Sequence, residues 1–279
     1  MDLSAYGKGE DDECALDKNN PSGVCSPDSI ITELIVGVAG IDKKKAATIP
    51  AKEALKIAET ATGCDSESCV IRTSIIPEKA NKILNNYFKP PGPRDTIDLF
   101  DNFAIDSTLE MYTKKYKGFL HVPMQMIDFM ERGTELAKIQ IDKIIDAGYK
   151  SIGCILNTDV SSGRGIHWFS VFCDLNHAGV GRDPYTIEYF NSSGRLPMSA
   201  IHIWANQKKA ELEAKGMHRC EFIIATRKQQ QQDHHSCGPY SVYYIWSRLE
   251  GVPHSWFDEN FVTDKRMLDF RKHLFRKTA

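Results

Sequence analysis

The sequence predicts an α+β protein in which a helical region precedes a core built on a β-sheet. Three observations lead to this fold class. Apolar residues at helical spacing dominate the first 90 residues, strand-like runs gather between residues 150 and 225, and an apolar, aromatic segment follows at 240–246. Helices and strands that cluster in different parts of a chain favour α+β over alternating βαβ units.

The N-terminal third divides into two expected segments. Residues 1–26 are polar, so we expect them to be disordered or loosely ordered. Residues 27–89 are expected to form a helical arm region, because three prolines there each precede apolar residues at helical spacing. The run Pro90-Pro91-Gly92-Pro93 ends this region as a stiff hinge.

Residues 94–279 are expected to form the core. A capping pattern from Asp106 to Glu110 predicts a helix that runs to about residue 116, and helical periodicity returns over about 124–145. Strands are expected at 151–156, 165–175, 185–190 and 220–225, and helices at 199–215, 237–249 and 263–275.

Composition and charge bound the class of protein. A hydrophobic content of 42% and a charged content of 26% are ordinary for a globular protein. The formal net charge of -2 argues against wholesale nucleic-acid binding. Apolar runs stay shorter than the ~18 residues of a membrane span, and the start of the chain lacks the basic-then-apolar pattern of a signal peptide. We therefore expect an intracellular protein without a membrane partner.

The eight cysteines are expected to be free thiols, since intracellular compartments keep thiols reduced. Cys64 and Cys69 lie close together, but no second pair repeats their spacing, so they form only a weak zinc motif. No metal and no other cofactor is expected.

One cysteine stands in a setting suited to catalysis. Cys237 follows the polar run 229–233 and precedes Gly238, Pro239 and the apolar residues 240–246. Pro239 fits the first turn of a helix but not its interior, which places Cys237 at the helix N-terminus. Backbone N–H groups and the helix dipole favour a thiolate there, and thiolate is the nucleophilic form. The alternative is that Cys237 is a small buried core residue, as most free cysteines are.

A thiolate nucleophile needs an imidazole beside it and a third group that orients the ring. His167 follows the loop 161–165 and begins a strand of alternating apolar residues, while Asn191 ends the next strand. Each has a plainer interpretation, a half-buried histidine and a turn residue. The oxyanion would need the Cys237 backbone N–H and a side-chain amide from the glutamine run 229–232.

These residues resemble a known family. His167-Trp168, the strand end 188–192, and Gln231 placed six residues before Cys237-Gly238 resemble the SUMO-specific and adenovirus-type cysteine proteases. Further blocks at 63–71, 156–159, 187–192, 238–242 and 273–276 resemble the polyprotein-processing members of the African swine fever virus type. The resemblance covers nearly the whole chain except the first 25 residues and the segment 177–184.

The resemblance implies a papain-like core of the ubiquitin-like-protease type, preceded by a helical arm. It implies Cys237 as the nucleophile, His167 as the base, Asn191 as the orienting group and Gln231 as an oxyanion donor. Trp168 would line a narrow tunnel that admits Gly-Gly, although plain core packing also explains it. The substrates would be viral structural polyproteins with Gly-Gly-X sites, cleaved during virion maturation in the host cytoplasm and virion.

Two departures from the family pattern and two alternatives stay open. Asn191 stands where the SUMO proteases have Asp, and Gln231 is chosen among four glutamines by spacing alone. A deconjugating isopeptidase acting on ubiquitin-like modifiers would also meet Gly-Gly. A zinc- or nucleic-acid-binding module would use the basic tail 265–277 and the ligands His218, Cys220, His235 and Cys237, which lack two close pairs. The oligomeric state is left open.

Overall fold

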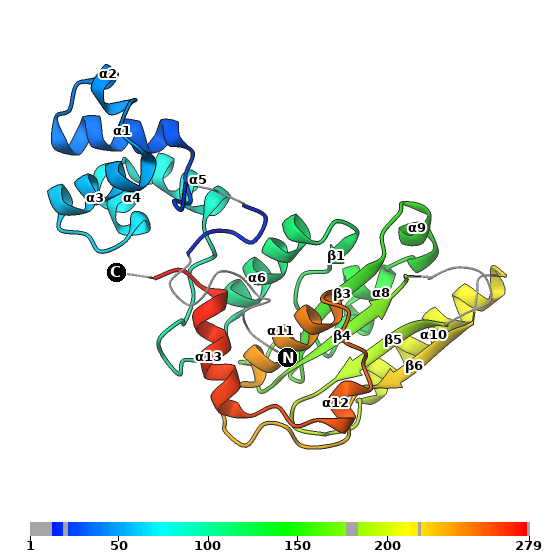
Figure 1. Ribbon diagram of the computed structural model, residues 1–279. Helices are drawn as coiled ribbons and strands as arrows, with labels where there is room; N and C mark the ends of the chain where they lie inside the picture. The colour runs from blue at the N-terminus through cyan, green and yellow to red at the C-terminus, as the bar shows by residue number, and fades with distance from the viewer. Residues whose placement is uncertain (1–12, 19–21, 177–183, 217–218, 278–279) are drawn as a thin grey trace. The chain divides into compact units, whose positions relative to one another are not determined.

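The computed structural model describes residues 13–18, 22–176, 184–216 and 219–277 (Figure 1). The chain divides into two compact units. One comprises Met1–Thr96 together with Arg271–Ala279, and the other comprises Ile97–Phe270. The expected segments 1–26, 27–89 and 94–279 remain predictions as domain boundaries.

The first unit is helical. Its helices are α1 (Asp28–Ala39), α2 (Lys43–Ala46), α3 (Ala51–Thr62), α4 (Glu67–Ser74) and α5 (Pro77–Tyr87). Its core forms where the apolar faces of these helices meet, with Ile35, Ala58 and Ile71 fully buried. Two of the prolines expected to open helices do so, since α3 follows Pro50 and α5 begins at Pro77.

Two disulfides lie in the first unit and correct the expectation of eight free thiols. Cys14 pairs with Cys25 and Cys64 pairs with Cys69, whereas Cys154, Cys173, Cys220 and Cys237 are free. The chain brings the Cα atoms of the two pairs to 4.9 and 5.6 Å, the separation that a disulfide requires. The weak zinc motif is thereby also explained, because its two thiols are bonded to each other.

The described residues ahead of α1 are packed against this unit. Ala15 and Val24 are buried. The buried carboxylate of Glu67 accepts hydrogen bonds from the backbone N–H groups of Cys25 at 2.7 Å and Ser26 at 2.8 Å. A side chain from α4 therefore fixes the chain entering α1. Residues 1–12 and 19–21 lie outside the described part.

The second unit is organised around a mixed sheet. Its strands are β1 (Phe119–His121), β2 (Gln125–Met126), β3 (Ser151–Asn157), β4 (Trp168–Asp174), β5 (Tyr185–Phe190) and β6 (Cys220–Ile224). The order is β1-β3-β4-β5-β6, with β2 also paired to β3. The three central strands are antiparallel, and β1, β2 and β6 join them in parallel.

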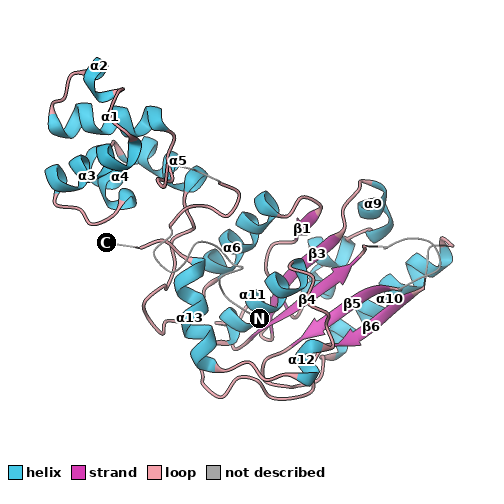
Figure 2. Cartoon of the chain, viewed as in Figure 1, coloured by secondary structure: helices cyan, strands magenta, loops and turns pink. Residues whose placement is uncertain are grey.

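The two faces of the sheet are covered by different helices, because successive side chains of a strand point to opposite sides. On one face Phe169 and Tyr189 join a core cluster with residues of α10 (Ser199–Ala214). On the other face Phe190 stacks on Tyr244 of α11 (Cys237–Leu249) with ring centroids 4.5 Å apart. Figure 2 shows α11 passing along β4, with the helix start near the end of the strand that carries Trp168.

Two expected elements take a different form. Helix α6 (Asn102–Lys115) is capped at its N-terminus by Asp101, whose side chain accepts from the Ala104 N–H at 2.8 Å. Asp106 therefore lies inside the helix, where its carboxylate accepts from the Met124 N–H instead. The expected helix over 124–145 is replaced by β2 and three short helices, α7 (Phe129–Arg132), α8 (Glu135–Lys138) and α9 (Ile141–Asp146). Gly133, in the left-handed conformation at φ 58°, ends α7.

The remaining elements are α12 (Trp256–Glu259) and α13 (Asp264–Leu274). Strand β4 begins at Trp168, three residues later than expected, so His167 lies in the loop just before it. Within the described ranges, the chain contains no helix with the length and apolar character needed to cross a bilayer.

Candidate active site

The N-terminus of α11 holds Cys237 in a tightly packed position. The helix is buried from Cys237 through Ser247, and the cysteine itself is 5% exposed. Gly238 allows this close packing, because a Cβ at that position would lie 2.6 Å from the Cβ of Phe100. The predicted helix start is confirmed. In its sequence Cys-Gly-Pro, Gly238 stands where the loop that carries Phe100 approaches the helix.

A carboxylate that the sequence did not single out shapes the turn before α11. Asp233 accepts from the backbone N–H groups of His235 at 3.2 Å and Ser236 at 2.9 Å, and from the Ser236 hydroxyl at 2.5 Å. Burial alone would raise the pKa of Asp233, but these hydrogen bonds outweigh it and lower the pKa. The negative charge therefore stays in place and fixes the loop that delivers Cys237.

His167 and Asn191 meet as the sequence predicted. His167 Nε2 lies 2.8 Å from Asn191 Oδ1. Asn191 is 1% exposed, and its Oδ1 also accepts from the backbone N–H and hydroxyl of Ser193 at 2.9 and 2.8 Å. Its Nδ2 donates to the Tyr189 hydroxyl at 2.8 Å. The amide oxygen thus faces the imidazole, which carries its proton on Nε2 and leaves Nδ1 as the basic nitrogen.

Burial sets the charge states of the two central groups. The pKa of the Cys237 thiol is raised because burial outweighs the backbone N–H groups of Trp168, Gly238 and Cys237 itself, which act in the opposite direction. The pKa of His167 is lowered, chiefly by burial and further by the charge of Arg195, against the bond to Asn191. Burial thus opposes the effect of the helix N-terminus, which alone would favour a thiolate.

Two hollows meet at Cys237. One has a volume of about 370 Å³ and is lined by Trp168, Phe100 and Leu99 among others, and the other has about 410 Å³ and contains His167 and Gln231. Cys237 and the exposed Ile166 line both. Each volume lies in the range of ~300–1,000 Å³ that is usual for binding clefts. An extended chain crossing from one hollow to the other would pass the thiol.

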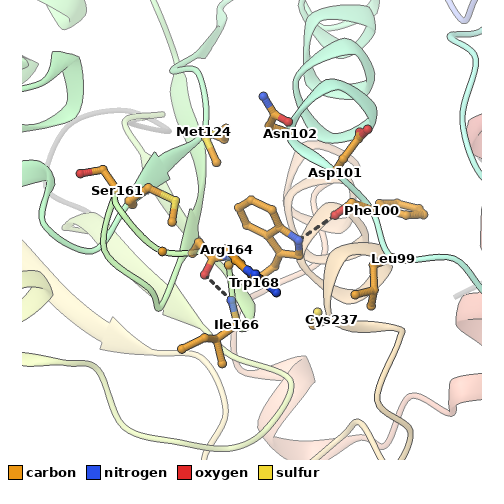
Figure 3. Close-up of a pocket in the computed structure, with 14 residues that line it drawn as sticks. Leu99, Phe100, Asp101, Asn102, Met124, Ser161, Arg164, Ile166, Trp168 and Cys237 are labelled. Carbon is orange, nitrogen blue, oxygen red and sulfur yellow. Dashed lines mark hydrogen bonds between the residues drawn. The ribbon is translucent and has the colours of Figure 1, made fainter.

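Trp168 belongs to the first hollow, where it and Cys237 approach each other (Figure 3). It is 9% exposed. Its indole Nε1 donates to the backbone oxygen of Phe100 at 2.9 Å, which fixes the plane of the ring. As the first residue of β4 it points to the face of the sheet that α11 covers. The position suits the tunnel wall that the resemblance implies, and that assignment remains a prediction.

Among the four glutamines, Gln231 and Gln230 have clearly different surroundings. Gln231 accepts from the Ser192 hydroxyl at 2.8 Å through Oε1 and donates through Nε2 to the backbone oxygen of Asp233 at 3.0 Å. It lines the hollow that holds His167 and Cys237. Gln230 is fully buried and bonds backbone groups of Phe257 and Val262. Gln231 Nε2 also donates to Asp233 Oδ1 at 3.1 Å, and Gln229 and Gln232 line the same hollow. Gln230 serves the fold, and Gln231 as the oxyanion donor remains a prediction.

The loop before His167 rests on two residues that the sequence reasoning missed. Asn157 Oδ1 accepts from the N–H groups of Asp159 at 3.0 Å and Ile166 at 2.9 Å. The Asp159 carboxylate accepts from the Gly165 N–H at 3.0 Å. The sequence Asn-Thr-Asp-Val-Ser-Ser-Gly-Arg-Gly at 157–165 was the available signal, because Asn and Asp side chains commonly organise turns in this way.

The zinc and nucleic-acid alternatives gain no support from the described residues. Among them no group of three or more His, Cys, Asp or Glu side chains could hold a metal ion. Cys220 is buried, and its backbone is in register with Tyr185, at the end of β5 opposite to the end that leads to Asn191. It therefore lies at the far end of the strand from the site. In the basic tail Arg271 and Arg276 are buried, so the tail does not present a continuous solvated face. His218 lies outside the described residues.

Comparison with known proteins identifies the family to which the chain is similar. The profile of the Ulp1 protease family, C-terminal catalytic domain, matches residues 149–278. Cysteine proteases of African swine fever virus, one of them named a SUMO-1 cysteine protease, are 36% identical over 235 residues, which is 77% of this chain and 84% of theirs. A crystal structure of the African swine fever virus protease superimposes with a TM-score of 0.81 at 30% identity, covering 99% of both chains.

Proposed function

This chain belongs to the Ulp1 family of cysteine proteases, in the type found in African swine fever virus, and we propose that it cleaves viral structural polyproteins after Gly-Gly pairs during virion maturation. The observation that carries this proposal is the placement of Cys237. Its thiol lies between a hollow walled by Trp168 and a hollow lined by His167, whose ring is bonded to the buried Asn191.

The geometry supports a general-base mechanism. Burial favours the neutral forms of the thiol and the imidazole, and we infer that Nδ1 of His167 takes the thiol proton as Sγ of Cys237 attacks the carbonyl carbon. The oxyanion is stabilised by the Cys237 N–H and by Gln231. His167 then gives its proton to the departing amine, and a thioester remains. In the second half of the reaction His167 takes a proton from water as the water oxygen attacks the thioester carbonyl. The C–S bond then breaks, and His167 returns the proton to Sγ of Cys237.

Selectivity for glycine would come from the first hollow. The Trp168 indole, held by the backbone oxygen of Phe100 (Figure 3), lines this hollow together with Cys237, and a fixed indole would leave room for a backbone more readily than for a Cβ. A viral polyprotein processed inside an infected cell would present such sites in an unfolded linker. Host cytoplasm and virion are therefore the compartments that we propose.

The test compares a Gly-Gly-X peptide with its Gly-Ala-X counterpart, using the wild-type chain and Cys237→Ser. We expect kcat/KM for the alanine peptide to be lower by at least ~10²-fold, equivalent to ~2.7 kcal/mol of transition-state binding. Cys237→Ser should lose turnover and keep its fold, because serine is nearly isosteric but a much weaker nucleophile. Cys173→Ser, a free buried cysteine outside both hollows, is the matched control and should stay active.

A second arm separates polyprotein cleavage from deconjugation. The same Gly-Gly acyl group is joined either to an α-amine or to a lysine side chain, and the two rates are compared. A clear preference for the isopeptide would overturn the polyprotein proposal in favour of a deconjugating enzyme. Activity that survives in folded Cys237→Ser would overturn both.

A further inference from the structure

We propose that the Tyr189 hydroxyl is a positioning group that locks the amide orientation of Asn191, and thereby the tautomer of His167. This inference rests on the protease function proposed above, because it concerns how the catalytic base is kept ready. Tyr189 lies on β5, two residues before Asn191, and is 2% exposed.

The need for such a lock follows from the choice of Asn. The two ends of a carboxamide have the same shape but opposite hydrogen-bonding character. With oxygen toward His167, Nε2 holds the proton and Nδ1 is free to act as the base. With nitrogen toward His167, the amide donates to Nε2, the proton moves to Nδ1, and the base is lost. An aspartate has two acceptor oxygens and does not meet this problem.

At the oxygen end, the protein supplies donors. Asn191 Oδ1 accepts from the Ser193 backbone N–H at 2.9 Å and from the Ser193 hydroxyl at 2.8 Å, in addition to His167. A backbone N–H can only donate. The Ser193 N–H therefore favours the amide oxygen at this end, and the group at the other end sets how strongly that orientation is preferred.

At the nitrogen end, the protein supplies an acceptor whose direction is also fixed. The Tyr189 hydroxyl accepts from Asn191 Nδ2 at 2.8 Å and donates its single proton to the backbone oxygen of Arg195 at 3.2 Å. A carbonyl oxygen can only accept, so the hydroxyl turns its lone pair toward Asn191. Burial raises the pKa of Tyr189 to about 12, and the phenol keeps its proton throughout the neutral range.

The surrounding core holds the ring of Tyr189 without help from the hydroxyl. Its ring packs on Phe169 with centroids 5.3 Å apart, and its backbone pairs with Val171. Tyr189→Phe therefore removes the acceptor and keeps the packing. Without the acceptor, the amide orientation with oxygen toward His167 no longer gains the hydrogen bond from Nδ2. The free-energy difference between the two orientations shrinks, and the population with nitrogen toward His167 rises.

The experiment reads the tautomer and the rate separately. Nitrogen NMR of the His167 ring reports which nitrogen carries the proton, and it does so without substrate. In Tyr189→Phe we expect the equilibrium between the two His167 tautomers to shift about tenfold toward Nδ1–H, as for one lost buried hydrogen bond, and kcat to fall in proportion to the Nε2–H population lost, at little-changed KM. Tyr185→Phe, on the same strand and the same face near its other end, should leave both readouts unchanged.

A second background tests the mechanism behind the effect. In Asn191→Asp the group facing His167 is an oxygen in either orientation, so Tyr189→Phe should no longer change the tautomer and should lower kcat less than about twofold. Equal losses in both backgrounds would reduce Tyr189 to a packing residue, and an unchanged His167 tautomer in Tyr189→Phe would overturn the lock. If the wild-type chain shows no cleavage that depends on Cys237, the proposed function fails, whereas the NMR measurement still decides the lock.

Discussion

The charge states of Cys237 and His167 show how desolvation competes with hydrogen bonding at single residues. Three backbone N–H groups stabilise the anionic form of the Cys237 sulfur, yet burial raises the thiol pKa. Burial likewise lowers the pKa of His167. Both shifts favour the neutral form of the group, a thiol for Cys237 and an imidazole for His167. In the proposed mechanism the proton is transferred when substrate arrives.

A pH prediction follows for His167. An imidazole acts as a base only when neutral, and a lowered pKa keeps it neutral to lower pH, so the acid limb of kcat/KM should lie below ~6.5. Arg195→Gln removes a positive charge that lowers the pKa of His167, and the limb should move upward. Arg219→Gln, an exposed arginine near the start of β6, is the control. An acid limb of kcat/KM above the ordinary histidine pKa, or one that does not move in Arg195→Gln, would contradict the assignment of His167 as the base.

Elements, rather than isolated residues, hold Trp168 in place. The indole begins β4 and bonds the backbone oxygen of Phe100. Phe100 in turn rests where the α11 backbone has only a glycine, Gly238. A strand start, a loop and a helix start therefore converge on one wall of the first hollow. Removing the indole should loosen that wall and leave the sheet behind it intact.

The corresponding prediction is that Trp168→Ala narrows the Gly/Ala gap in kcat/KM and lowers the rate on Gly-Gly itself, because the substrate is positioned less tightly. Trp204→Ala is the matched control. Trp204 is fully buried and its Nε1 donates to the backbone oxygen of Leu136 at 2.9 Å, but it lines neither hollow. Both variants should lose ~3–5 kcal/mol of stability, so rates are measured on the folded fraction. An unchanged Gly/Ala ratio in Trp168→Ala would leave Trp168 as a core residue.

On the scale of the whole molecule, the disulfides belong to one unit and the site to the other. Replacing Cys14 and Cys25 by serine should lower the free energy of unfolding of the first unit by about 2.7 kcal/mol, and replacing Cys64 and Cys69 by about 2 kcal/mol, because the first pair closes the longer loop. Cleavage of a short peptide should persist in both variants. Thermal melting without reductant measures the difference, and identical melting of all three proteins would contradict the pairing.

Some features of this protein have local sequence signals, and others do not. Strand positions and the start of α11 could be predicted, because alternating apolar residues and a first-turn proline are local signals. The bond between His167 and Asn191 was also within reach, since both stand at strand ends. The disulfides were not predicted, because the cysteines were expected to stay reduced, although each pair lies within 11 residues. The Asp233 turn and the acceptor Tyr189 are also local, but apolar periodicity does not show which side-chain atoms meet. The pKa of Cys237 escaped prediction for a similar reason, since sequence does not reveal burial.

The two hollows that share Cys237 and Ile166 bear on the order in which products depart. Each half of a cleaved chain would occupy a hollow of its own, so the amine half can diffuse away while the acyl half remains tethered as a thioester. The vacated hollow then admits water or another amine. Such a site predicts ping-pong kinetics, and it predicts that an added glycine-rich amine at high concentration diverts part of the product from hydrolysis to ligation.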